Sequence, residues 1–130
     1  MIKIQNKSKR KNTNTNNKNR HNKTIIMCLD FLNNLKLFHW NTHSYSQHMA
    51  SDELYENLTK SIDTLVESFL QQRISIKTTI SLNTNPNIFM KHLTEFKKYM
   101  NQIHLSNELL SLRDDILVAL DQFEYRLTLK

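Results

Sequence analysis

One predicted helix of the chain carries four side chains that metal ions bind, spaced so that they share a face. These residues are His48, Asp52, Asp63 and Glu67. At 100° per residue, the three carboxylates lie about 40°, 60° and 100° around the helix from His48. A fifth candidate, His39, lies on the apolar side of the preceding helical stretch, where an imidazole needs a polar partner. Imidazole and carboxylate donors together suit iron, zinc or manganese, so the pattern predicts a metal site.

Asp52 and Asp63 lie too far apart to bind one metal ion within a single chain. They are eleven positions apart, which is about 16 Å along a helix axis. If two copies of this helix cross antiparallel near Leu58, the His48 end of one copy faces the Glu67 end of the other. The spacing therefore predicts a site that is completed twice at a two-fold interface. Two histidines with three carboxylates could hold Fe(II) and its oxidised product and leave a position for oxygen or peroxide.

Several readings of these residues stay open at this stage. His43 lies four positions after His39 and could replace His48 as a ligand. Zinc could take the place of iron, although the single cysteine, Cys28, allows no Cys-rich structural zinc site. Taken one at a time, His39 is better explained as a hydrogen-bonded core residue and the carboxylates as a solvated helix face, and it is the five positions together that favour a metal site.

The elements that position these residues are expected to be helices. The 130 residues include no glycine and one proline, Pro86, which disfavours β-hairpin folds and excludes glycine-rich nucleotide-binding loops. Apolar residues recur at steps of three and four over about 24–42, 46–73, 87–103 and 107–129. This spacing predicts four helices with one buried face each. Thr24, Ser46 or Ser51, and Ser106 are the candidate helix N-caps.

The connections between these helices favour one bundle topology. A few residues join the first helix to the second and the third to the fourth, whereas about 13 residues, 74–86, separate the second from the third. A single long crossover is typical of ferritin-like bundles, whereas an up-down-up-down bundle has three short loops. The expected fold class is therefore all-α, with a ferritin-like four-helix domain over residues 24–130.

The first 23 residues differ in composition from the rest and are expected to form a disordered basic arm. The chain has eight Lys or Arg and no acid before Asp30, against ten basic and twelve acidic residues from there onward. Such an arm is suited to the phosphates of DNA, while a targeting signal, RNA contact or a solubility role are the alternatives. The candidate nucleic-acid contacts are Lys3, Lys7, Lys9, Arg10, Lys11, Lys18, Arg20 and Lys23.

The segment FHWNTHSYSQHMASDELYENLTKSIDTLVESF resembles the Dps proteins, the DNA-binding ferritin-like proteins of starved cells. The resemblance covers about 35 residues closely and is divergent, since the stretch from His39 to His48 is about three residues shorter than in that family. It rests on a His-Trp pair, a His and an Asp four apart, a Leu-Tyr pair, and an Asp and a Glu four apart. These are His39 with Trp40, His48 with Asp52, Leu54 with Tyr55, and Asp63 with Glu67.

The resemblance implies a ferroxidase centre between subunits, with the two histidines and the first Asp from one chain and the second Asp and the Glu from its two-fold mate. It implies a miniferritin that binds one or two irons per site, oxidises Fe(II) with peroxide or oxygen, sequesters the product and protects DNA through its arm. The partners implied are other copies of the chain, as a dimer or a dodecameric cage, and DNA.

The alternative function is a non-enzymatic DNA-binding or structural helical bundle, for example of a large DNA virus, with a vestigial or zinc-occupied site. No apolar stretch approaches the roughly 20 residues of a membrane span, and the N-terminus lacks an apolar secretory signal. We therefore expect no membrane partner and an intracellular protein, cytoplasmic or nucleoid-associated, or located in the virion or viral factory in the viral alternative.

Overall fold

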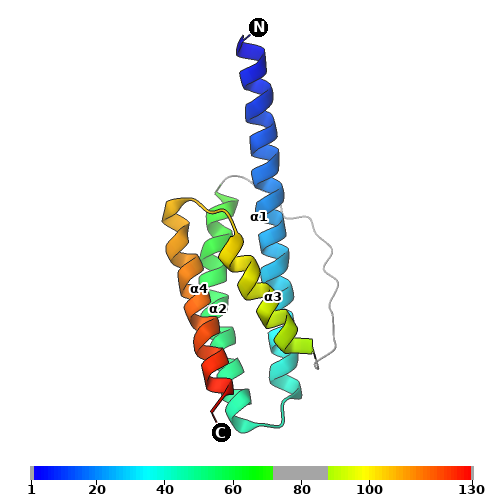
Figure 1. Cartoon of the computed structure of the whole chain (residues 1–130), viewed down its shortest axis with the longest axis vertical. Helices are drawn as coiled ribbons and strands as arrows, with labels where there is room; N and C mark the ends of the chain where they lie inside the picture. Colours follow the sequence, from blue (N-terminus) through cyan, green and yellow to red (C-terminus); the bar gives the residue numbers. More distant parts are fainter. Residues whose placement is uncertain (1, 72–87, 130) are drawn as a thin grey trace.

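Four helices and no strand make up the described part of the chain. In the computed structural model they are α1 (Ile2–Asn41), α2 (Tyr45–Leu70), α3 (Phe89–Gln102) and α4 (Asn107–Leu127) (Figure 1). The structure describes residues 2–71 and 88–129, with the backbone alone for residues 2–15 and 17. The all-α class is confirmed, and apart from the start of α1 every helix boundary lies within about three residues of its predicted position.

The helices form two antiparallel pairs, α1 with α2 and α3 with α4, each joined by a short link. α1 and α4 each pack against both α2 and α3. The pairs α1 with α4 and α2 with α3 are the diagonal ones, and across the first diagonal the ring of Phe38 on α1 meets that of Phe123 on α4 edge-on, with 6.1 Å between centroids. α2 and α3 run in the same direction, and the end of α2 and the start of α3 lie toward opposite ends of the bundle (Figure 1). The predicted crossover, residues 74–86, lies outside the described residues.

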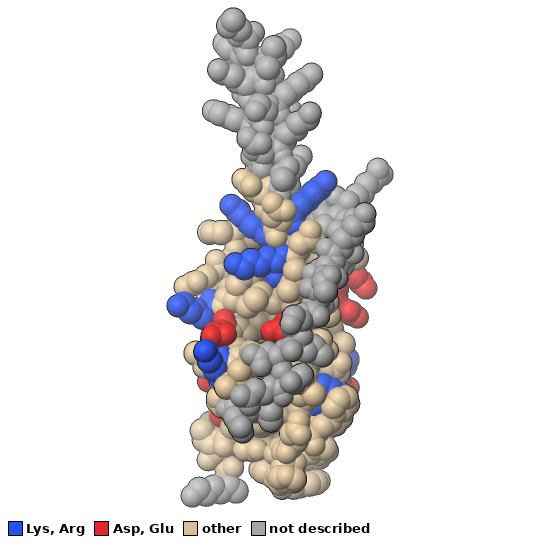
Figure 2. Space-filling view, turned by 90° about the vertical axis from the view of Figure 1, so that its right-hand side faces the viewer, with Lys and Arg blue, Asp and Glu red and all other residues tan. Residues whose placement is uncertain are grey.

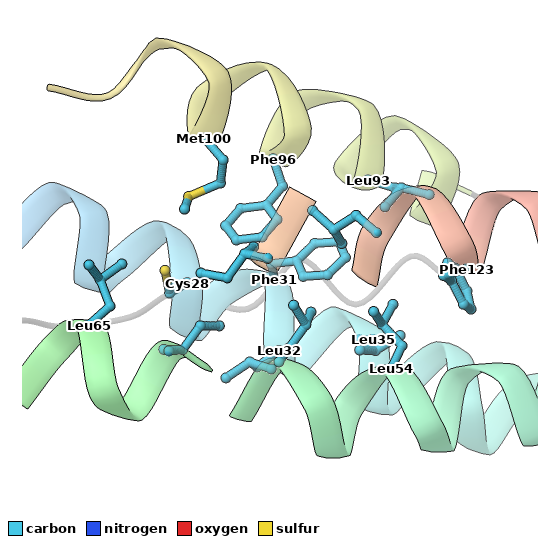
Figure 3. Close-up of a cluster of buried hydrophobic side chains, with 14 of the residues drawn as sticks. Cys28, Phe31, Leu32, Leu35, Leu54, Leu65, Leu93, Phe96, Met100 and Phe123 are labelled. Carbon is cyan, nitrogen blue, oxygen red and sulfur yellow. The ribbon is translucent and has the colours of Figure 1, made fainter. Parts of the chain in front are cut away.

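The core is built from apolar residues on one face of each helix. Side chains from all four helices point into one interior (Figure 3). The ring of Phe31 on α1 stacks on Phe96 of α3 at 4.5 Å between centroids and on Phe89 at 5.9 Å. Residues with no exposed surface include Leu58 on α2 and Leu120 on α4, and burying one such side chain stabilises the fold by roughly 1.5 to 3 kcal/mol.

Among the described residues, no helix contains an apolar stretch of the length that a membrane span requires.

The expected disorder of residues 1–23 is not confirmed, because the structure continues α1 through this segment from Ile2. The 40 residues of α1 correspond to about 60 Å of helix, and its N-terminal part projects beyond the bundle (Figure 1). The physical reason is that a helix already nucleated by packed residues extends without a new nucleation cost, and the arm has no glycine or proline to end it. Packing also begins before residue 24, since the ring of His21 stacks on Phe69 at 4.0 Å.

The helix caps differ in part from the predicted ones. Thr24 is not an N-cap: it lies buried inside α1, where its hydroxyl donates to the Arg20 carbonyl and pairs with the Tyr99 hydroxyl at 2.8 Å. The N-cap of α2 is Ser44, whose Oγ accepts from the backbone N–H of Gln47. These predictions were wrong because α1 starts earlier, and α2 starts one residue earlier, than the apolar pattern suggests. Ser106 occupies the N-cap position of α4, as the sequence predicts, but its side chain makes no capping hydrogen bond.

Candidate metal centre

His39 and His48 lie face to face beside the short link between α1 and α2. Their ring centroids are 3.9 Å apart and the ring planes differ by 22°. His39 belongs to the buried side of α1, with 8% of its surface exposed, whereas His48 is exposed in the first turn of α2. The antiparallel pairing of the two helices therefore places two of the five predicted ligands side by side.

Each imidazole is held by the backbone of the opposite helix. His39 Nδ1 lies 3.0 Å from the carbonyl oxygen of His48 and 2.9 Å from Ser51 Oγ. In return, His48 Nδ1 lies 3.2 Å from the carbonyl oxygen of His39. Because a carbonyl oxygen only accepts, both Nδ1 atoms must carry a proton and donate. The hydroxyl of Ser51 donates to the His48 carbonyl at 3.0 Å, so its oxygen can accept from His39.

This arrangement fixes the tautomer of both rings. When Nδ1 of a neutral imidazole carries the proton, the lone pair that binds a metal is on Nε2. Neither Nε2 has a hydrogen-bond partner among the described residues. The local fold thus orients two nitrogen donors by the same kind of bond that orients metal-binding histidines elsewhere.

The three predicted carboxylates, Asp52, Asp63 and Glu67, lie on the solvent side of α2, and all three are exposed. Asp52 follows His48 by one helical turn, and Asp63 lies about 16 Å farther along the axis. Of the ion pairs formed between described residues, none involves these three carboxylates.

One chain alone does not bring the five predicted ligands together. In residues 2–71 and 88–129, no three side chains of His, Cys, Asp or Glu are grouped so that they could hold a metal ion. The structure brings His39 and His48 together, and it leaves Asp63 and Glu67 at the far end of α2.

Exposed apolar side chains surround the histidine pair. Trp40 and Tyr45 are 68% and 79% exposed, and Met49 beside His48 is 43% exposed. Aromatic residues and methionine are enriched in the centres of protein interfaces. The exposed end of the α1–α2 hairpin is therefore a candidate contact surface.

All eight predicted nucleic-acid contacts lie on α1. The side chains of Lys3, Lys7, Lys9, Arg10 and Lys11 lie outside the described residues, although their backbone is helical. Lys18, Arg20 and Lys23 are exposed at the level where α1 enters the bundle. Lys23 Nζ lies 5.7 Å from the ring centroid of Tyr99, within reach of a cation–π contact.

Two features of the structure were not predicted from the sequence. Ser51 was a candidate only for a helix cap, yet its buried hydroxyl links His39 to the His48 carbonyl. The sequence did contain a signal for this role, because Ser51 falls on the apolar side of α2 near His48. The second feature is a pocket where Arg20 and Lys23 meet the link between α3 and α4. No local spacing could reveal it, because its two halves are about 80 residues apart.

No curated protein and no solved structure matches the chain. One family model does match, over residues 39–127, which is more than half of the chain and includes all five predicted ligands. The match begins at His39 and leaves out the basic N-terminal part of α1. By this match the chain belongs to DUF5856, a family of unknown function.

Proposed function

We propose that two copies of the chain bind Fe(II) at a shared two-fold interface and promote its oxidation. The ligands are His39, His48 and Asp52 of one copy with Asp63 and Glu67 of the other. The observation that carries the proposal is the histidine pair, in which each ring is fixed through Nδ1 and keeps an Nε2 lone pair without a partner. Metal-binding histidines characteristically donate their other ring N–H to a carbonyl or a carboxylate in this way.

The dimer is supported by the surface on which the ligands lie. Antiparallel crossing of two α2 helices near their middle brings the His48 end of one against the Glu67 end of the other, because the ligand positions lie on one side of the helix. The exposed side chains of Trp40, Tyr45 and Met49 flank the same end of α2 and would lose water-exposed apolar area on association.

The helix arrangement supports a ferritin-like bundle. α2 and α3 run in parallel on a diagonal, and the four pairs of adjacent helices are antiparallel. A chain with this arrangement needs one long connection from the end of α2 to the start of α3, as in ferritin-like folds. In such bundles metal sites are built from carboxylates and histidines on the helices.

Iron is the substrate in this proposal, and the site would take one or two ions. Imidazole nitrogen and carboxylate oxygen suit both oxidation states of iron, and negative carboxylates favour the more highly charged product. Each Fe(II) gives up one electron. Hydrogen peroxide accepts two electrons and two protons and becomes two water molecules. The chain binds and orients the iron and keeps its oxidation away from free solution.

The experiment that tests the shared site uses two isosteric variants of exposed residues, Asp52→Asn and Glu67→Gln. Each homodimer of a variant carries the lesion in both sites and should bind Fe(II) poorly in an anaerobic titration. When the variants are mixed and allowed to exchange, a heterodimer has both lesions in one site and leaves the other intact. Random exchange should therefore restore about a quarter of the wild-type sites.

A matched control is Glu95→Gln, which changes an exposed carboxylate on α3 and should leave iron binding unchanged. His43→Ala tests the alternative ligand, and the proposal expects no loss. A wild-type protein that binds no Fe(II) would refute the iron site. Mixed variants that exchange subunits, shown by native mass spectrometry, without any recovery would refute the cross-chain assignment.

DNA binding by the N-terminal part of α1 is the second part of the proposal, and it is supported by the eight basic residues that precede the first acid. Deletion of residues 1–17 tests this role. It stops at residue 17 because packing against the rest of the bundle starts at His21. That deletion removes five basic residues, so the slope of log affinity against log salt should fall by up to about 4.5. Duplex binding that is unchanged by the deletion would refute this role.

A second candidate function is a structural helical bundle without iron chemistry. The favouring observation is that His39 and His48 already satisfy each other's backbone carbonyls within one chain. Zinc could then occupy the pair at an interface. The two candidates differ in one measurement: only the ferroxidase consumes peroxide in proportion to added Fe(II).

A further inference from the structure

A second polar site lies at the other end of the bundle from the histidine pair, where α1 enters it. A pocket of about 260 Å³ opens there between α1 and the C-terminal end of α3. Its walls come from α1 (Arg20, His21, Lys23 and Thr24) and from the end of α3 and the following link (Tyr99, Gln102, Ile103 and His104).

The pocket is lined by hydrogen-bond donors and positive charge. Arg20 and Lys23 are cationic, and His104 is an exposed imidazole across from them. Among the described residues that line the pocket there is no carboxylate. Figure 2 shows Lys and Arg side chains gathered where α1 leaves the bundle, while the Asp and Glu side chains of the face shown lie farther from the arm. The pocket therefore has the electrostatic character of an anion site.

One of the residues that line the pocket, His21, carries a buried polar atom without a partner. Its ring is stacked flat on Phe69, with 4.0 Å between centroids and 7° between planes. In that position Nδ1 is buried and has no hydrogen-bond partner among the described residues. A buried polar atom without a partner is destabilising and in native structures is often explained by a ligand or a water. Burial also lowers the pKa of His21, so an anion that supplies a partner would counteract this effect.

The fixed parts of the pocket make it a preformed site. Thr24 is buried and its hydroxyl pairs with the Tyr99 hydroxyl at 2.8 Å, which ties α1 to α3. Lys23 rests above the Tyr99 ring. The volume of the cavity equals that of about nine water molecules at roughly 30 Å³ each. It is smaller than the pockets that bind drug-sized ligands. It has room for one phosphate with part of its ester group.

We infer that this pocket binds a phosphate group, with Arg20, Lys23 and His104 as the contacts and His21 as the buried partner. Two sources share this chemistry, the backbone of a nucleic acid and free inorganic phosphate. The inference is independent of the iron site. Only the choice of the nucleic-acid source rests on the proposed DNA binding of α1, whose basic residues lead directly to the pocket.

The test uses two charge-matched double variants. Arg20→Gln with Lys23→Gln removes two charges from the pocket, and Lys7→Gln with Lys11→Gln removes two charges from the distant part of α1. Arg20 and Lys23 are exposed, and circular dichroism checks that both variants are folded. Two-dimensional NMR of the histidine rings in the full-length protein follows the addition of inorganic phosphate, with chloride at equal ionic strength as the reference.

Phosphate should shift the ring signals of His21 and His104, and the pocket variant should reduce its affinity about tenfold or more, because hydrogen bonds to charged groups are the strong ones. The distant variant should keep wild-type phosphate affinity. For a 20-base-pair duplex, the pocket variant should lose more affinity than the distant variant. Equal losses would assign the pocket to free phosphate alone. Ring signals that do not respond to phosphate at 10 mM would overturn the inference, whatever the outcome of the iron and arm-deletion experiments.

Discussion

Removing the Ser51 hydroxyl tests whether the histidine pair is held as the structure indicates. The change Ser51→Ala deletes two hydrogen bonds, from His39 Nδ1 to Ser51 Oγ at 2.9 Å and from Ser51 Oγ to the His48 carbonyl at 3.0 Å. No donor is left unpaired, because His39 Nδ1 still reaches the same carbonyl at 3.0 Å. The free energy of unfolding should therefore fall by the net value of two hydrogen bonds, about 1 kcal/mol each. The better helix propensity of alanine offsets about 0.5 kcal/mol of this loss.

The expected destabilisation is about 1.5 kcal/mol, which for a domain of this size lowers Tm by about 6 °C. Thermal unfolding followed by circular dichroism, in buffer with a metal chelator, measures it. Ser68→Ala is the matched control on the same helix. Its hydroxyl donates to the Thr64 carbonyl at the exposed surface, where water can replace it, so no loss of Tm is expected. Fe(II) affinity should fall about tenfold in Ser51→Ala only, as for other groups that orient a metal ligand.

Equal melting temperatures for the Ser51 and Ser68 variants would show that the hydroxyl does not hold His39. NMR of the imidazole nitrogens gives a second check, because both His39 and His48 should carry the proton on Nδ1 at pH 8. A wild-type spectrum with the proton on Nε2 of either ring would refute the tautomer on which the iron proposal rests.

Three further predictions concern the core and the surface of the bundle. Phe31→Ala should lower the free energy of unfolding by about 3 to 5 kcal/mol in urea titrations, because Phe31 is buried between α1 and α3; a loss below 1 kcal/mol would contradict this packing. Burial raises the pKa of the Cys28 thiol to about 12, so a thiol reagent at pH 8 should label it only after unfolding, and rapid labelling of the native protein would contradict its burial. The hydrogen bond to Asp121, together with Glu124, raises the pKa of Lys97. Its ion pairs should stabilise the fold below the ordinary lysine pKa of 10.5 and lose that effect as the pH rises through the raised pKa. Lys97→Met should cost no more than about 1 kcal/mol because both carboxylates are at least partly exposed, and the difference should disappear in 1 M salt.

The helices that carry buried faces were predictable from the sequence alone. Leu58, Leu65 and Phe69 repeat at helical spacing and are fully buried, because one apolar face per helix is enough to specify its packing. The sequence also predicted that the buried imidazole of His39 needs a polar partner. The identity of that partner depends on the geometry of the α1–α2 hairpin, which brings His48 and Ser51 next to His39.

The start of α1 was not predictable from composition. Asparagine and lysine offer no core contacts, which indicates disorder when the segment is considered alone. The segment is continuous with a packed helix, however, and continuity overrides weak local preference. The pocket around Arg20 and His104 was unpredictable for a different reason, because contacts between distant segments leave no periodic pattern in the sequence. The five candidate ligands could be identified from the sequence, whereas the completion of the metal site by a second chain stays a prediction.

The reciprocal bonds of His39 and His48 have a consequence for how relatives of this chain should be compared. Each histidine closes the α1–α2 hairpin by binding the other's backbone, so selection for folding alone would keep both residues in a relative that has lost every metal. Asp52, Asp63 and Glu67 form no ion pair among the described residues, and all three are exposed. Without a functional role these three positions would drift freely. Across the family, retention of the three carboxylates would therefore support the proposed iron site, whereas retention of the two histidines alone would not distinguish that site from a role in the stability of the hairpin.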